Sequence, residues 1–186
     1  GNWPLAAASP VPYLAHGAVP AALDRSGMDA ITAQFVAATR RAAACGFDWL
    51  ELHCAHGYLL SSFLSPLSNV RTDAYGGSLQ NRARFPLEIA TAVRAVWPAD
   101  KALFVRLSAT DWMDDEKRGF TLDEAVQVAR WLKEVGVDVL DVSSAGNSPE
   151  SKPQYGRMYQ VPFAERIRYE AGIPVMTVGG VAGMDH

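Results

Sequence analysis

Helical and strand-like patterns alternate along most of the chain, and this alternation limits the possible folds more than any other feature. Four segments repeat apolar residues at helical spacing, namely 29–45, 81–97, 121–135 and 162–171. Each is followed by a short apolar run typical of a strand, at 47–53, 102–107, 137–142 and 173–178. Because strands that are joined through helices pair in parallel, the sequence predicts an α/β fold with a parallel sheet.

Residues at the segment ends support these boundaries. Asp29 opens the first helical pattern, and Thr121 with Glu124 three residues later has the spacing of a capping box. Residues 1–27 are rich in Pro, Ala and Gly and show neither helical nor alternating periodicity. We therefore predict a surface loop over residues 1–27 and one α/β domain over residues 28–186.

Polar residues or glycines follow the predicted strands at their carboxyl ends: His53, Arg106, Ser143, Ser144, Gly179 and Gly180. In a (β/α)8 barrel the active site lies on that face. Doubly wound sheets also bind ligands beyond the carboxyl ends of their strands, so this arrangement alone leaves both folds open. Four parallel strands leave two edges unpaired and apolar surface exposed. We therefore expect further strands before residue 28 and after residue 186, or a second copy of the chain, to complete the sheet.

The composition is that of an ordinary globular protein. The chain has 186 residues, 49% of them hydrophobic, and a formal net charge of -3 without any run of Lys or Arg. This argues against nucleic acid or a membrane surface as the main partner and favours a small molecule. Cys45 and Cys54 lack a metal or redox spacing, and we expect both to be buried in a protein of the reducing cytoplasm.

His53 and His56 suggest a reactive site at the end of the first predicted strand. Neutral imidazoles can ligate a metal, or their N–H groups can bind an oxygen that gains negative charge. A metal site needs further ligands, and we expect Glu51 to lie on the opposite face of the strand, so no metal is predicted. Histidines held only by local hydrogen bonds remain the alternative.

Tyr58 follows two residues after His56. A phenol is a weak acid that can give a proton to a carbanion. A packed aromatic residue whose hydroxyl reaches water explains the same pattern equally well. Spacing alone does not decide between these interpretations.

The stretch "ELHCAHGYLLSSFLSPLSNVRTDAYGGSLQNRARF", residues 51–85, resembles the signature of the Old Yellow Enzyme family of flavin-dependent ene reductases. The resemblance covers about residues 28–180 and continues through "LFVRLSATDW", "VDVLDVSS" and "YQVPFAERIR". The xenobiotic-reductase branch is the most similar, and the chain also resembles the reductase half of bifunctional salicylyl-CoA 5-hydroxylases.

This resemblance implies a (β/α)8 TIM barrel with FMN at its carboxyl face, of which the chain covers about strands 4 to 7. It implies that His53 and His56 bind the acceptor oxygen of the substrate, and that Tyr58 donates a proton. Arg106 resembles the arginine beside the pyrimidine edge of the flavin. An arginine within an apolar strand also needs a buried anionic partner.

Two glycines and one loop complete the expected site. Gly179 and Gly180 would let the backbone approach the FMN phosphate, although turn geometry explains them about as well. We interpret the loop 71–82 as structural: polar pairs of Arg71, Asp73, Asn81 and Arg82 fix it, and Ser78 caps the next helix.

The resemblance implies an FMN-dependent NAD(P)H oxidoreductase that reduces activated C=C bonds of carbonyl or acyl-CoA compounds. Counterparts of the family's first three strands and of its strand 8 Gly-Arg pair are missing from this sequence. The main alternative is therefore a non-catalytic barrel fragment that folds by self-association, as a homo-oligomer, and does not bind flavin on its own. A metal-dependent lyase using His53 and His56 is a third reading.

Overall fold

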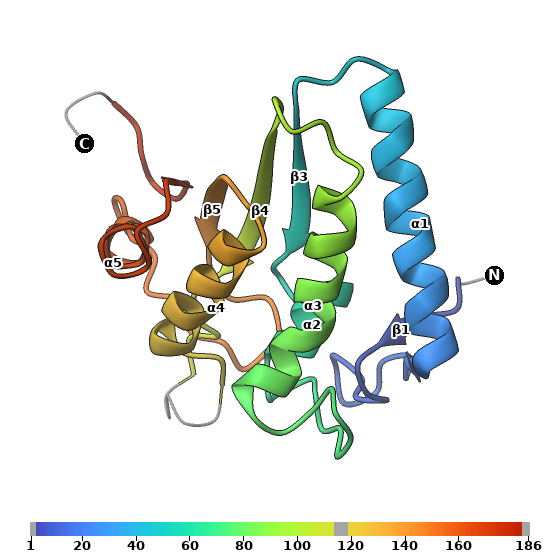
Figure 1. The fold of residues 1–186 in the computed structure, drawn as a ribbon. Coiled ribbons are helices and arrows are strands. Elements are labelled where there is room, and N and C mark those ends of the chain that lie inside the picture. The colour runs from blue at the N-terminus through green and yellow to red at the C-terminus, as the bar shows by residue number, and fades with distance from the viewer. Residues whose placement is uncertain (1–2, 114–118, 184–186) are drawn as a thin grey trace.

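The computed structural model describes residues 3–113 and 119–183. The predicted segments 1–27 and 28–186 both extend into residues outside these ranges. The elements, in chain order, are β1 (Ala6–Ala7), β2 (Ala21–Ala22), α1 (Arg25–Ala44), β3 (Trp49–Cys54), α2 (Leu59–Leu64), α3 (Leu79–Arg94), β4 (Ala102–Ser108), α4 (Leu122–Glu134), β5 (Val139–Ser143), α5 (Val161–Ala171) and β6 (Val175–Thr177). Helices and strands thus alternate as the sequence predicts (Figure 1).

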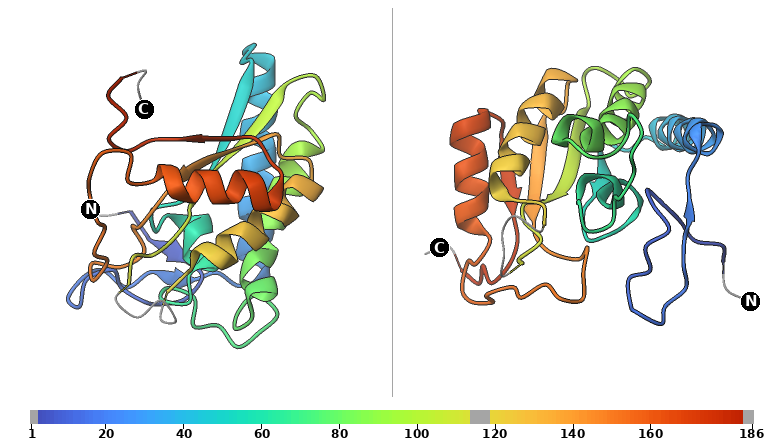
Figure 2. Two further views of the ribbon diagram at one scale, coloured as in Figure 1. Left: turned by 90° about the vertical axis from the view of Figure 1, so that its left-hand side faces the viewer. Right: turned by 90° about the horizontal axis from the view of Figure 1, so that it is seen from below.

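The main sheet has four strands in the order β3-β4-β5-β6, and every pair is parallel. Each strand therefore lies beside its successor along the chain, and the connecting helices α3, α4 and α5 lie along one side of the sheet (Figure 2). All the carboxyl ends lie at the same edge as a result. This edge holds the polar residues that the sequence places at the strand ends.

The two faces of the sheet differ in burial. Leu103, Val105 and Leu107 of β4 and Leu140 of β5 point to the helix side and are fully buried. Burial of a side chain of this size stabilises the fold by about 1.5–3 kcal/mol. The alternate residues point to the other face, where Trp49 is still 51% exposed. The described residues therefore bury one face of the sheet and leave the other partly open.

The helix ends follow local capping. The predicted capping box of Thr121 and Glu124 is present in full, and Ser78 caps α3 by accepting from the backbone N–H of Asn81. The predicted start of the first helix at Asp29 is wrong by four residues. Asp24 is the N-cap, because its carboxylate accepts from Gly27 N at 2.7 Å. Asp29 instead lies within α1 and forms an ion pair with Arg25, four residues earlier.

Three features differ from the expectations. Residues 1–27 are not loop throughout, because β1 and β2 pair in parallel there and α1 already begins at Arg25. Helix α2 was not predicted, since six residues are too few to show a period. Cys54 is buried as expected, but Cys45 is exposed at the end of α1.

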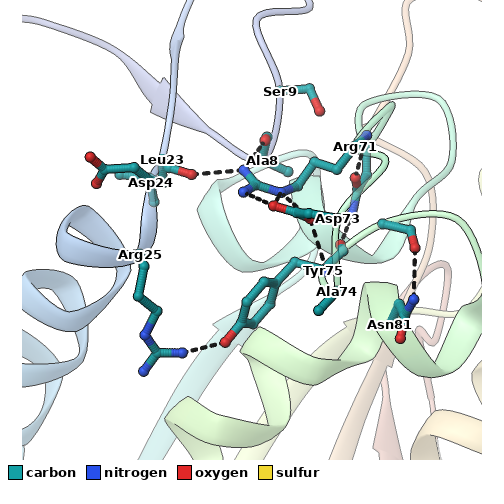
Figure 3. A network of polar contacts seen from close by, with 12 residues as sticks. Ala8, Ser9, Leu23, Asp24, Arg25, Arg71, Asp73, Ala74, Tyr75 and Asn81 are labelled. Carbon is teal, nitrogen blue, oxygen red and sulfur yellow. Dashed lines mark hydrogen bonds and ion pairs between the residues drawn. The ribbon is translucent and has the colours of Figure 1, made fainter.

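Arg71 ties the amino-terminal segment to the loop after α2 (Figure 3). Its Nη1 donates to the carbonyls of Ala8 (2.8 Å) and Leu23 (2.7 Å), while Nε and Nη2 donate to Asp73. The side chain is only 12% exposed. The predicted locking of this loop by polar pairs is confirmed, and Asn81 adds a hydrogen bond to the Gly76 carbonyl.

We predict that Arg71→Leu loosens residues 3–23. The variant removes the donor of two carbonyls and the guanidinium that pairs with Asp73, and hydrogen bonds to charged groups contribute about 1.5–3 kcal/mol each. Urea unfolding should show a loss of about 3 kcal/mol, with faster proteolysis between residues 10 and 20. Arg40→Leu, at an exposed position of α1, is the control and should change neither measurement. Equal cleavage rates in both variants would contradict this role of Arg71.

Candidate active site

One row of side chains crosses the open face of the sheet near the carboxyl ends of the strands. The parallel register pairs His53 with Arg106, Arg106 with Asp141, and Asp141 with Met176. Residues paired in this way point to the same face of a sheet. Histidine, arginine and aspartate thus lie next to one another.

Glu51 lies on this same face, and the expectation that it faces away from His53 is wrong. Residues two apart in a strand point to the same side. Accordingly, Arg106 and Asp141 influence the pKa values of both Glu51 and His53. Even so, no group of three or more His, Cys, Asp or Glu side chains in the described part of the chain is placed to hold a metal ion.

Arg106 and Asp141 form the central ion pair of this row. Arg106 Nη1 lies 3.0 Å from Asp141 Oδ2, and the Asp141 side chain is only 2% exposed. Asp141 is the buried anionic partner that an arginine in an apolar strand was predicted to need. Burial raises the pKa of Asp141, while the charges of Arg106 and His53 oppose the shift.

Arg106 Nε and Asp141 Oδ1 are buried without a hydrogen-bond partner among the described residues, and so is Glu51 Oε2. A buried polar atom without a partner costs free energy. Hydrogen-bonding capacity therefore remains on the open face of the sheet beside His53.

The chain reverses direction directly after β3, in a tight turn that holds His56. His56 has a φ of 59° and Gly57 a φ of 73°, both in the left-handed region. A Cβ on Gly57 would lie 2.2 Å from the carbonyl oxygen of Gly146. Only glycine fits this contact, so the turn rests directly on the loop after β5.

The three predicted catalytic side chains come together at this turn. The ring centroids of His53 and His56 are 5.4 Å apart, and those of His53 and Tyr58 are 5.1 Å apart. Tyr58 occupies the N-cap position of α2 and is 64% exposed. The histidine pair and the phenol therefore line one small area, with the phenol at its solvent side.

Both histidines have lowered pKa values. Burial lowers the pKa of His53 below its ordinary 6.5, and the charge of Arg106 lowers it further, while Asp141 opposes the shift. For His56, burial, Arg106 and His53 all lower the pKa. Both imidazoles are therefore neutral near pH 7, and each has one N–H group and one ring nitrogen that accepts.

A chain of hydrogen bonds connects the backbone of this turn, at Gly57, to the buried carboxylate of Asp111. Buried Asp111 accepts from Asn147 Nδ2 at 2.7 Å; Asn147 accepts from Ser61 at 3.0 Å; and Ser61 accepts from the backbone N–H of Gly57 at 3.2 Å. Burial raises the pKa of Asp111, although its hydrogen bonds oppose the shift. The sequence analysis missed this network, since its members come from three separate segments.

Cys54, which lies next to His53 in β3, is unreactive. Cys54 is fully buried, and burial raises the pKa of its thiol to about 12. A thiol in this state is neither a nucleophile nor a metal ligand at neutral pH. Cys54 therefore serves as a small apolar side chain behind His53.

Gly179 and Gly180 follow β6 and pack against the segment before α5. A Cβ on Gly179 would lie 2.5 Å from the Tyr159 ring, and one on Gly180 would lie 2.5 Å from the Gly156 carbonyl oxygen. These close approaches explain both glycines structurally. A role for their backbone in phosphate binding stays a prediction.

Comparisons with known proteins agree on the family. The model of the NADH:flavin oxidoreductase / NADH oxidase family matches residues 9–185. An NADPH dehydrogenase of Geobacillus thermodenitrificans is 46% identical over 173 residues, which cover 93% of this chain and 49% of that protein. An NADH:flavin oxidoreductase of Gibberella zeae is 40% identical over 195 residues, with coverage of 97% and 47%. The chain thus spans about half the length of the curated relatives it matches.

Solved structures show the same fold. Morphinone reductase in complex with tetrahydroNAD superposes with a TM-score of 0.74 at 26% identity, over 97% of this chain and 50% of that one. The complex of 2-naphthoyl-CoA reductase with 2-naphthoyl-CoA gives a TM-score of 0.85 at 23% identity, over 98% of this chain and 28% of that one. Within the described residues, none of the helices is long and apolar enough to cross a membrane.

These matches confirm the predicted resemblance and the predicted fold, a four-stranded part of a (β/α)8 barrel. The chain belongs to the NADH:flavin oxidoreductase / NADH oxidase family.

Proposed function

We propose that the protein acts as an FMN-dependent NAD(P)H oxidoreductase of the ene reductase type. The observation that carries this proposal is the cluster of His53, His56 and Tyr58 beside Arg106 at the carboxyl ends of parallel strands. The names of the relatives, NADPH dehydrogenase and NADH:flavin oxidoreductase, support the reaction class. We further propose a cytoplasmic location and a small enone or acyl-CoA-type substrate.

The residues of the open face fit a flavin. Arg106 is a partly exposed cation, and its buried Nε lacks a partner among the described residues, so it can hold an anionic or electron-rich ring edge. Gly179 and Gly180, which follow β6, are the proposed phosphate contacts. When bound, FMN supplies a hydride to the β-carbon of an activated alkene.

His53 and His56 would bind the carbonyl oxygen of the substrate. Because both imidazoles are neutral, each can offer one N–H group to an oxygen that becomes negative during the reaction. Loss of one such donor costs about 2.7–4 kcal/mol in known oxyanion sites. The histidines therefore bind the acceptor group and stabilise the charge that develops on it.

Tyr58 would protonate the α-carbon of the substrate. Its phenol lies next to the His53 ring and is largely exposed, so water can return a proton after each turnover. The two groups then have separate tasks: the imidazoles bind oxygen, and the phenol gives a proton to carbon.

A second candidate function is that of a non-catalytic barrel segment that self-associates. Trp49 is 51% exposed and Met176 is 37% exposed on the open face of the sheet. Exposed apolar side chains of this kind can be buried by contact with another chain. In this case the site residues are present, but the self-associated chain does not bind flavin on its own.

Titration of the chain into FMN tests these two functions. We expect saturable quenching of flavin fluorescence with one FMN per chain, and a visible spectrum that changes on addition of NADPH or NADH. Arg106→Met should weaken FMN binding, whereas Arg40→Met on α1 should not. Absence of binding at concentrations where sedimentation shows a stable oligomer would favour the non-catalytic segment.

His56→Ala in the flavin-loaded protein tests the oxyanion role. Phenols mimic the acceptor oxygen, and we expect their affinity to fall about 100-fold, which corresponds to about 2.7 kcal/mol. The perturbation of the flavin spectrum by phenol measures this affinity. His16→Ala, in the exposed amino-terminal segment, is the matched control. Unchanged phenol binding in His56→Ala would refute the assignment.

The histidines should titrate below their ordinary pKa of 6.5. Arg106→Met removes a positive charge and should raise both midpoints in an NMR pH titration, whereas Arg106→Lys should keep them low. Since the unfolded chain binds these protons at higher pH than the folded chain, the two groups also lower the free energy of unfolding as the pH falls below 6.5. Midpoints at or above 6.5 in the unmodified chain would contradict the described environment.

A further inference from the structure

The hydroxyl of Ser143 lies between His56 and a buried glutamine. Ser143 Oγ is 2.7 Å from His56 Nε2 and 3.4 Å from Gln160 Oε1. Ser143 is 5% exposed and Gln160 2% exposed. Ser143 ends β5, two residues after Asp141, so its side chain points to the same open face as the row of His53, Arg106 and Asp141.

The orientation of the Gln160 amide is fixed by its other contacts. Nε2 donates to the Val178 carbonyl at 2.8 Å, so Oε1 must face the two serines. The Ser144 hydroxyl donates to this oxygen at 2.5 Å. Gln160 Oε1 is an acceptor only; it has two lone pairs, and the short hydrogen bond from Ser144 uses one of them.

Ser143 has a single hydroxyl proton and two possible acceptors. Hydrogen bonds from a hydroxyl are usually about 2.7–2.8 Å long, so Gln160 Oε1 at 3.4 Å is a poor acceptor and His56 Nε2 at 2.7 Å is a good one. The proton therefore points to His56 Nε2. In a neutral imidazole the ring proton must then be on Nδ1.

We infer that Ser143, whose hydroxyl lies much nearer to His56 Nε2 than to Gln160 Oε1, is a positioning residue that holds His56 in the Nδ1–H tautomer. Nδ1 has no hydrogen-bond partner among residues 3–113 and 119–183. It is therefore the nitrogen that remains for a ligand.

The consequence for the site rests on the proposed function. With the proton on Nδ1, His56 donates to the acceptor oxygen of the substrate. With the opposite tautomer, a lone pair on Nδ1 would face that oxygen and repel it. Ser143 thus decides whether His56 helps or hinders binding, although it does not touch the substrate itself.

The backbone of His56 is held independently of its ring. Its N–H donates to Ser108 Oγ at 3.0 Å, and Ser108 in turn donates to the Ala145 carbonyl at 2.8 Å. Removal of the Ser143 hydroxyl therefore leaves the turn in place and frees only the ring. This separation makes the inference testable by a single substitution.

Long-range 1H–15N correlation spectra of the full 186-residue chain, recorded at pH 7.5, show which ring nitrogen carries the proton. We expect His56 to carry it on Nδ1 in the unmodified chain. Ser143→Ala should shift His56 toward the Nε2–H tautomer, and Ser143→Thr, which keeps the hydroxyl, should retain Nδ1–H. His53, which is not among the hydrogen-bond partners found for Ser143 in the described residues, serves as the internal reference in each spectrum.

In the flavin-loaded protein, Ser143→Ala should weaken phenol binding about tenfold, the effect of one ordinary hydrogen bond, and Ser143→Thr should restore it. An Nε2–H signal for His56 in the unmodified chain would overturn the inference, even if Ser143→Ala does not fold. An unchanged tautomer in folded Ser143→Ala would overturn it as well.

The proposed function and this inference fail separately. A chain that binds neither FMN nor phenol refutes the proposed function, whereas the NMR spectra need no flavin and still decide the tautomer. An Nδ1–H tautomer that disappears in Ser143→Ala would confirm the role of Ser143 in holding the ring in either case.

Discussion

The parallel register of β3, β4 and β5 is the constraint on which the site depends. It places His53, Arg106 and Asp141 side by side on one face, so that a cation, its buried carboxylate and an imidazole share one environment. The lowered pKa values of the histidines come first from burial, and the neighbouring charge of Arg106 lowers them further. Register therefore determines the electrostatics of the site before any ligand is considered.

The apolar periodicity of the sequence predicted the helices and strands of the main sheet, because burial on one face and helix capping act over short distances. The caps at Ser78 and Thr121 were predicted for the same reason. The observed strand ends differ from the predicted ones by one or two residues, since the hydrogen bonds that define them come from a neighbouring strand. The pairing of His53 with His56 also followed from local spacing.

Contacts between segments that are distant in sequence could not be predicted from the sequence. Nothing in the residues around Asp111 or Gln160 indicates that each is buried below the site and bonded to serines from other elements. Ser143 was noted as a polar strand end, but its direction toward His56 depends on the turn after β3. Glu51 was misplaced because a strand's period of two was applied with the wrong phase.

The contact between Gly57 and Gly146 joins two loops that are far apart in sequence into one rigid body. A Cβ on Gly146 would lie 2.3 Å from His56 Cα, so neither loop can shift without displacing the other. A change in the length of the segment after β5 would therefore alter the orientation of His56 across the sheet. Sequence variation in that segment, rather than at the histidines themselves, is then an available route for adjusting the orientation of His56.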